Sequence, residues 1–295
     1  MLHARHMNQH LGRATQTSAS YLRKESCEDA RLGQEIYESF LPRISKLTET
    51  MSGGYMHVDP RSSLSLDNKY LGAYRGRALY TGPLSSTLDA LRTIEIILGQ
   101  NVLPMTSLYP LLRGVYENAA TAVWIISPDS RDVRLQRSYR LINQEIADQQ
   151  EFSRSIGVES TERVLVQRKE LDDLLAARPS VGTLREIRNA PKATEIVTAL
   201  DTVMSRTAEG KPPLFVLWQL FSGMAHGRQW AAVTLLNRTE AIADAVSDTA
   251  WVKMESSPRM TALALIGAIE SLEFALQQFG RRARGWTSVP EDALE

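Results

Sequence analysis

Residues 104–126, PMTSLYPLLRGVYENAATAVWII, decide the fold of this chain. From Leu108 to Ile126 the apolar residues return at three- and four-residue intervals, which is the spacing of one broad face of an α-helix. A helix this apolar needs other helices around it to exclude water. Pro110 is expected to kink it, because proline lacks a backbone N–H and crowds the preceding turn.

Three more segments have the same periodicity and complete the expected core: residues 83–98, 214–236 and 258–279. Pro83 is expected to open the first of these, and Gly280 to end the last. Further helices are expected outside this core, at about 26–51, 129–155, 158–177 and 191–204. Residues 52–82 contain paired glycines, Pro60 and several serines, and are expected to form a long surface connection.

The economical architecture is therefore all-α, a single bundle of about seven or eight helices. Residues 248–255 are the best strand candidate, so a small β-hairpin near 240–256 is the one expected exception. The expected organisation is a disordered N-terminal segment at 1–25, a single helical domain at 26–280 and a C-terminal tail at 281–295.

Composition narrows the functional classes. Lys+Arg and Asp+Glu number 34 each, so the chain lacks the basic excess on which non-specific nucleic-acid or anionic-membrane binding depends. Cys27 is the only cysteine, which excludes an internal disulfide and fits a reducing compartment. No apolar run has the length of a signal peptide core or a membrane span. We expect a cytoplasmic protein with no membrane contact.

Familiar motifs of enzyme chemistry do not occur. The sequence has no dinucleotide-binding or P-loop glycine pattern, no His-Glu-x-x-His and no Gly-x-Ser-x-Gly. His3, His6 and His10 have helix-like spacing near the N-terminus, but no carboxylate or further ligand lies beside them. We therefore expect no metal and no cofactor.

The stretch FSGMAHGRQW at 221–230 is the first candidate site. Ser222 and His226 are four residues apart and hence on one face of a helix, and small residues around them allow another backbone to approach. Histidine titrates near neutral pH, so His226 is a candidate acid or base, with Ser222 to orient it or be activated by it. The preferred alternative is a core histidine that is hydrogen-bonded at a tight helix crossing.

Arg113 and Glu117 form a second candidate, on the polar edge of the most apolar helix. Buried charges are tolerated only when each finds a partner, so this pair could line a cleft. The alternative is an exposed ion pair one turn apart, which contributes little.

A third candidate is an arginine series on the next helix, at Arg131, Arg134, Arg137 and Arg140. Steps of three residues drift around a helix, so these guanidiniums form a slanting strip that could contact phosphates or carboxylates. A solvated helix face is the preferred interpretation.

Together these features resemble a group of uncharacterised bacterial, actinobacterial-type helical proteins distantly related to the HEPN-like (higher eukaryote and prokaryote nucleotide-binding) superfamily. The resemblance rests on Leu-Leu-Arg113-x3-Glu117, the Trp-Ile-Ile that ends that helix, the arginines that follow, and Leu-Phe-Ser222-Gly-Met-Ala-His226-Gly. It covers roughly residues 83–279. HEPN ribonucleases place an arginine four to six residues before the catalytic histidine, and here the nearest arginine upstream of His226 is Arg206. Ribonuclease activity therefore does not carry over residue by residue.

Two functions follow as hypotheses. The favoured one is a non-catalytic helical binding domain for a small ligand, nucleotide or protein, with a homodimer left open. Its ligand-binding candidates are Arg113, Glu117, Arg134, Arg137, Ser222 and His226. The alternative is a metal-independent ribonuclease or phosphate-chemistry enzyme of toxin or phage-defence type, with catalytic candidates His226, Ser222, Arg113 and Glu117 and RNA as substrate.

Overall fold

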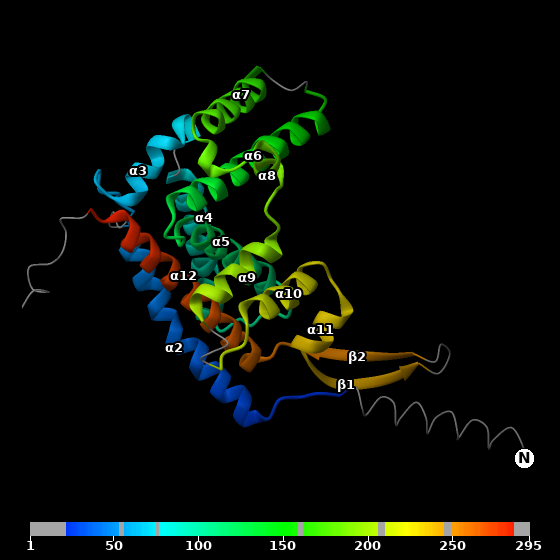
Figure 1. Cartoon of the computed structure of the whole chain (residues 1–295). Coiled ribbons are helices and arrows are strands. Elements are labelled where there is room, and N and C mark those ends of the chain that lie inside the picture. The colour runs from blue at the N-terminus through cyan, green and yellow to red at the C-terminus, as the bar shows by residue number, and fades with distance from the viewer. Residues whose placement is uncertain are drawn as a thin grey trace, which may run out of the picture.

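Helix α5 (Leu108–Ile126) lies at the centre of the structure, a computed structural model that describes residues 22–52, 56–74, 77–158, 162–205, 210–244 and 249–285. Helices α4 (Arg77–Gly99), α9 (Ala193–Met204), α10 (Leu214–Ala225) and α12 (Pro258–Ala283) pack around it. Twelve of its residues are buried. The expectation that residues 104–126 form the core helix is confirmed (Figure 1).

Pro110 does not kink this helix. Because α5 begins at Leu108, Pro110 falls in its first turn, where a missing N–H breaks no intrahelical hydrogen bond. Interlocked aromatic rings hold α5 to its neighbours. The Phe221 ring of α10 lies 5.6 Å from Tyr109 and 5.5 Å from Tyr116 between ring centres, and the Tyr116 hydroxyl donates to the Ala264 carbonyl of α12 at 2.8 Å.

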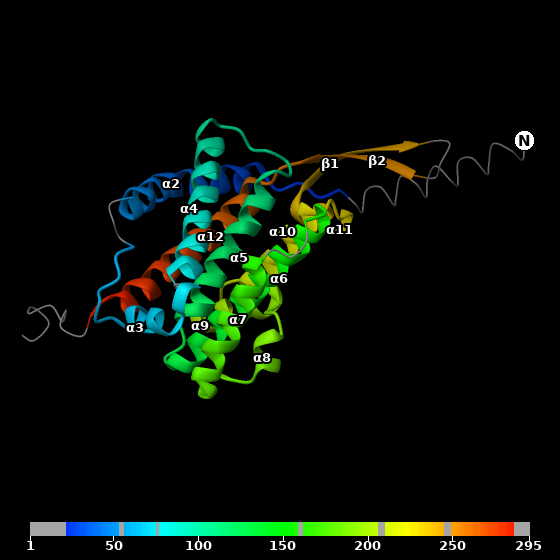
Figure 2. The ribbon, with the colours of Figure 1, turned by 90° about the horizontal axis from the view of Figure 1, so that it is seen from above.

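Helix α2 (Cys27–Ser52) runs parallel to α12 and packs against it along much of its length. Two ion pairs fix this direction, Asp29 with Arg259 and Arg43 with Glu273, because each partner advances by the same number of residues. At Gly33 the helices touch directly: a Cβ there would lie 2.5 Å from the Arg259 backbone nitrogen. Figures 1 and 2 show the two helices side by side.

The mostly helical class is confirmed, but the described residues form eleven α-helices, not seven or eight. Three of the additional helices are short: α3 (Ser63–Tyr70), α8 (Leu184–Arg188) and α11 (Gln229–Leu235). Such helices contain too few turns to show an apolar period. The expected long connection at 52–82 is wrong for this reason, since it contains α3, the 3₁₀ turn Gly72–Tyr74 and the start of α4.

A second group of helices packs beyond the central ones. It consists of α6 (Arg131–Ser155), α7 (Glu162–Ala177), the 3₁₀ turn Pro179–Val181 and α8. Local capping explains the starts of two of these helices. Ser130 accepts a hydrogen bond from the Val133 N–H at the start of α6, and Thr183 forms a capping box with Glu186 at the start of α8.

The expected hairpin is present. Strand β1 (Asn237–Asp244) pairs antiparallel with β2 (Thr249–Glu255), and in Figures 1 and 2 the pair projects beyond the helices. Residues 22–25, assigned from sequence to the N-terminal segment, are described: Arg23 exchanges both backbone hydrogen bonds with Arg238 at the base of β1. Residues 1–21, with His3, His6 and His10, and residues 286–295 lie outside the described part.

One helix of the described residues, α12, is long and apolar enough to cross a membrane. Most of it is buried against α2, α4 and α5, as expected for a core helix.

Candidate functional site

Arg113 and Glu117 meet α10 through a tryptophan. The Arg113 Nε donates to Glu117 Oε1 at 3.0 Å, and the Trp218 Nε1 of α10 donates to the same oxygen at 2.8 Å. Both charged side chains are about one-third exposed, whereas Trp218 is buried. The expectation of a charged pair on the polar edge of α5 is thus confirmed. Its partner on α10 is Trp218, a residue that sequence reasoning did not select.

Ser222 and His226 do not meet this pair. The helix expected to run from 214 to 236 ends at Ala225, because Gly227 adopts a left-handed backbone conformation with φ of 63°. His226 is therefore the C-cap residue of α10 and is exposed to solvent. The expectation of a core histidine at a helix crossing is wrong. The Ser222 Oγ is buried and has no hydrogen-bond partner among the described residues.

The small residues around His226 do permit a close approach, although of a different element. Helix α11 folds back on α10 so that a Cβ on Gly223 would lie 2.6 Å from the Ala231 Cβ and 2.8 Å from the Trp230 ring. Trp230 is 54% exposed. Gly223 thus leaves space for a tryptophan that lies half on the surface.

The arginine series is not a solvated face, and that expectation is wrong. Arg134 is only 3% exposed and forms a two-bond ion pair with Asp67 of α3, at 2.6 Å and 3.1 Å. Its remaining terminal nitrogen donates to the Pro128 and Asp129 carbonyls, both at 2.8 Å. Arg131 donates to the same Asp67 carboxylate at 3.1 Å. The ion pairs of Arg131 and Arg134 with Asp67 therefore hold α3 against this end of α6.

The other two arginines of the series have partners of their own. Arg137 donates to the Trp124 carbonyl at 2.6 Å and lies 5.0 Å from the centre of that indole ring, and burial lowers its pKa. Arg140 forms two hydrogen bonds with Glu195 of α9, at 2.7 Å and 3.0 Å. Those bonds lower the pKa of Glu195. All four guanidiniums thus have structural partners, and two of them share the Asp67 carboxylate.

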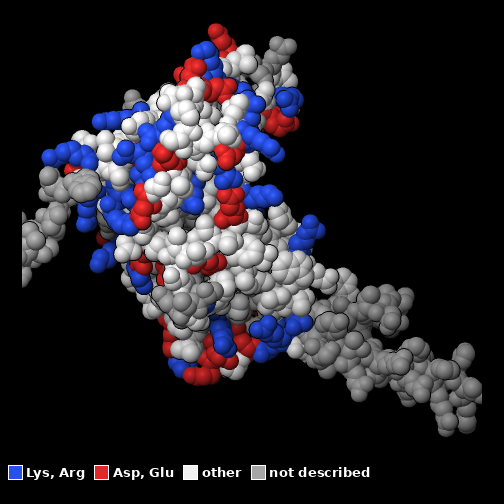
Figure 3. Space-filling view, viewed as in Figure 1, with Lys and Arg blue, Asp and Glu red and all other residues white. Residues whose placement is uncertain are grey.

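The predicted site residues therefore lie in three places: Arg113 and Glu117 on the α5–α10 edge, Ser222 and His226 at the end of α10, and Arg134 and Arg137 in the contacts of α6. From Trp218 to His226 the helix advances about 12 Å, so His226 is out of reach of the Glu117 network. In the described ranges no group of three or more His, Cys, Asp or Glu side chains could hold a metal ion. Figure 3 shows acidic and basic side chains interspersed on the face drawn, with basic residues more frequent near α3 and the end of α12.

Two exposed residues of the hairpin form a different kind of site. Ile242 and Trp251 are direct partners in the β1–β2 register and are 67% and 76% exposed. Exposed apolar surface of this kind marks contact sites for other macromolecules. Trp251 already lies in the segment 248–255, which the sequence predicts to be a strand. Its register partner Ile242 could not be recognised without the pairing.

Comparison of this chain with models of known protein families, with curated proteins and with solved structures finds no match. Function must therefore be inferred from the geometry of the chain's own residues.

Proposed function

We propose that this chain is a non-catalytic helical binding domain that acts as a homodimer, and that the β1–β2 hairpin joins the two copies. The exposure of Trp251 opposite Ile242, on a hairpin that projects from the helices, carries this proposal (Figure 2). A lone two-stranded hairpin is marginally stable in water, and large exposed apolar residues make it less favourable still. Both costs are removed when a partner covers the hairpin.

The free edge of β2 supports a second copy as this partner. In the described part of the chain β2 has β1 as its only neighbour, whereas the base of β1 also pairs with Arg23. A strand edge with unpaired N–H and C=O groups is a template for another strand. Two β2 strands that pair antiparallel are related by a two-fold axis, which is the commonest symmetry of homodimers.

The charges of the hairpin favour protein over nucleic acid. Residues 237–255 contain two basic residues and four acidic ones, so a phosphate backbone would be repelled. Lys253 lies 3.0 Å from Glu255 and 3.6 Å from Glu240, so this face carries both signs and can complement a copy of itself. The Trp251 and Ile242 side chains of two copies would bury roughly 150–200 Å² each. Together with strand pairing, this approaches the roughly 1,000 Å² of a specific interface.

Sedimentation velocity of the wild type and of two double variants tests the proposal. Trp251→Ser with Ile242→Ser removes the apolar pair, and Leu165→Ser with Phe152→Ser removes two apolar residues that are equally exposed, on α7 and α6. We expect the wild type and the second variant to be dimers at about 50 μM and the hairpin variant to be a monomer, with at least a roughly hundredfold weaker association. A monomeric wild type, or a dimeric hairpin variant, would contradict the proposal.

The ribonuclease alternative has less support. Arg113 is paired with Glu117, and Arg134 is buried and donates to internal acceptors, whereas His226 is exposed at the end of α10. If the wild type cleaves an RNA pool and a folded His226→Ala variant does not, the ribonuclease hypothesis would replace our proposal.

A further inference from the structure

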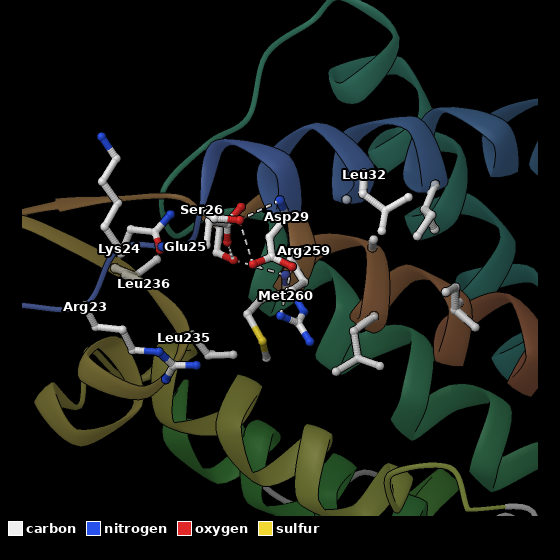
Figure 4. A pocket seen from close by; sticks show the side chains of 17 residues that line it. Arg23, Lys24, Glu25, Ser26, Asp29, Leu32, Leu235, Leu236, Arg259 and Met260 are labelled. Carbon is white, nitrogen blue, oxygen red and sulfur yellow. Dashed lines mark hydrogen bonds and ion pairs between the residues drawn. The ribbon is translucent and has the colours of Figure 1, made fainter.

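A cavity of 590 Å³ lies where the first turns of α2 and α12 meet the junction of α11 and β1. Figure 4 shows it bounded by these helices, with Arg23, Leu235, Arg259 and Met260 around the open space. Its volume is in the range of small-molecule sites, which run from roughly 300 to 1,000 Å³. Neither Arg113 nor Glu117 lines it, and it does not depend on the proposed hairpin contact.

The polar end of the cavity contains a carboxylate whose hydrogen bonds are incomplete. Glu25 accepts a hydrogen bond from the Ser257 hydroxyl on Oε2, and its backbone N–H donates to Asn237 Oδ1 at 3.1 Å. Its other oxygen, Oε1, is buried and accepts no hydrogen bond from any described residue. A buried carboxylate oxygen without a donor is unfavourable, so a bound group that donates there is stabilised.

A second buried polar group with no described partner lies within electrostatic range of Glu25. The Tyr109 side chain of α5 is 2% exposed, and its hydroxyl has no hydrogen-bond partner among the described residues. Burial raises the pKa of Tyr109 to about 12, and the negative charge of Glu25 contributes to this rise. Tyr109 does not itself line the cavity, so Glu25 Oε1 is the buried acceptor that the cavity offers to a bound donor.

The cations around the cavity do not neutralise Glu25. Arg259 is paired with Asp29 at 3.2 Å, and Arg23 donates to the Thr234 carbonyl at 3.2 Å. Lys24 is exposed, and in Figure 4 its side chain points away from the cavity. No described ion pair involves Glu25, so its carboxylate can pair with a cationic ligand.

The other end of the cavity is apolar. Leu32 and Ile36 of α2 face Met260, Leu263 and Ile266 of α12. Leu32 is 48% exposed although it lies in this apolar strip. From Met260 to Ile266 the helix advances about 9 Å, which suits an alkyl chain of medium length.

We propose that this cavity binds an amphipathic primary amine. The ammonium group donates to Glu25 Oε1, and the alkyl chain lies between α2 and α12 along Leu32. A positive charge and hydrogen-bond donors on one small head suit a carboxylate oxygen that has no donor among the described residues.

Calorimetric titration of the full chain with octylamine, octanol and octanoate, each below its micelle concentration at pH 7, tests this assignment. We expect octylamine to bind tightest, because it alone combines the charge with the apolar chain. Glu25→Gln keeps the size of the side chain and an acceptor for Ser257. It should weaken the binding of octylamine about tenfold or more and change the binding of octanol little. Glu35→Gln, an exposed change on α2, is the matched control and should leave the affinities for all three ligands unchanged.

A second variant separates the site from general effects on folding. Leu32→Ser alters an exposed position, so it should leave the melting temperature unchanged. It should weaken the binding of both octylamine and octanol severalfold. Tighter binding of octanoate than of octylamine would overturn the proposal in favour of an anion site at the two helix N-termini. Absence of octylamine binding at millimolar concentration, or equal binding by Glu25→Gln, would also overturn it.

Discussion

Arg134 and Asp67 form a two-bond ion pair in which both side chains are almost completely buried, at 4% and 8% exposure. The pair joins α3 to α6, which are also linked by Arg131 and by the hydrogen bond from the Tyr139 hydroxyl to the Tyr70 carbonyl. A charge that remains buried after its partner is removed costs about 3–5 kcal/mol.

The change Asp67→Asn should therefore lower the free energy of unfolding by about 3–5 kcal/mol, because Arg134 keeps its charge without a counterion. Asp89→Asn, at an exposed position of α4, should change it by less than about 0.5 kcal/mol. Urea denaturation of both variants measures the difference. Similar midpoints would show that the pair contributes little.

Replacement by alanine should change the stability in opposite directions at two helical glycines, Gly223 and Gly114. At Gly223 the new methyl group would collide with Ala231 and Trp230, so we expect a loss of about 1–3 kcal/mol. At Gly114 in α5 a Cβ meets nothing within 4 Å, so alanine should stabilise the helix by about 0.5–1 kcal/mol. Thermal melts that shift in the same direction would refute the assigned packing of α11 on α10.

The free energy of unfolding of the His226→Ala variant should lie within about 0.5 kcal/mol of that of the wild type, because the imidazole is exposed at the end of α10. This reverses the stability loss expected for a core histidine. The variant is for that reason a clean probe of catalysis, since any loss of RNA cleavage could not be attributed to unfolding. Calorimetry together with an RNA cleavage assay provides the measurement.

Alkaline pH should destabilise the fold through Tyr109, Tyr74 and Tyr139, whose pKa values burial raises to about 12. An unfolded tyrosine titrates near 10, so the folded state favours the neutral phenol. The stabilisation is complete below pH 10 and is lost as the pH rises through about 12. For Tyr109 this amounts to at most about 3 kcal/mol. The melting temperature of the wild type should fall between pH 10 and 11.5, and that of Tyr109→Phe should fall less. Equal falls in the two proteins would argue against a raised pKa of Tyr109.

The long helices were predictable because their apolar spacing repeats over many turns, as in α5 and α12. Short helices were not, since the eight residues of α3 include only one strongly apolar buried side chain, Leu64. Gly227 was seen in the sequence, but its left-handed conformation, which ends α10, follows from how α11 folds back onto Gly223.

The candidate site was predictable only within single helices. The Arg113–Glu117 pair follows from a spacing of four residues, whereas Trp218 and Asp67 come from distant elements and had no local signal. Glu25 could not be recognised as part of a cavity before α2 and α12 were placed together. Long-range contacts of this kind depend on the packing of whole helices, which a single sequence does not encode in any short pattern.

The parallel contact of α2 with α12 also has a consequence for synthesis of the chain. The residues that meet there, such as Arg43 and Glu273, are 230 positions apart. At roughly 5–20 residues per second, the ribosome needs on the order of ten to fifty seconds to deliver the second helix after the first. During that interval the face of α2 around Gly33 lacks its native cover, so nascent chains are most exposed to aggregation and chaperone binding at this helix.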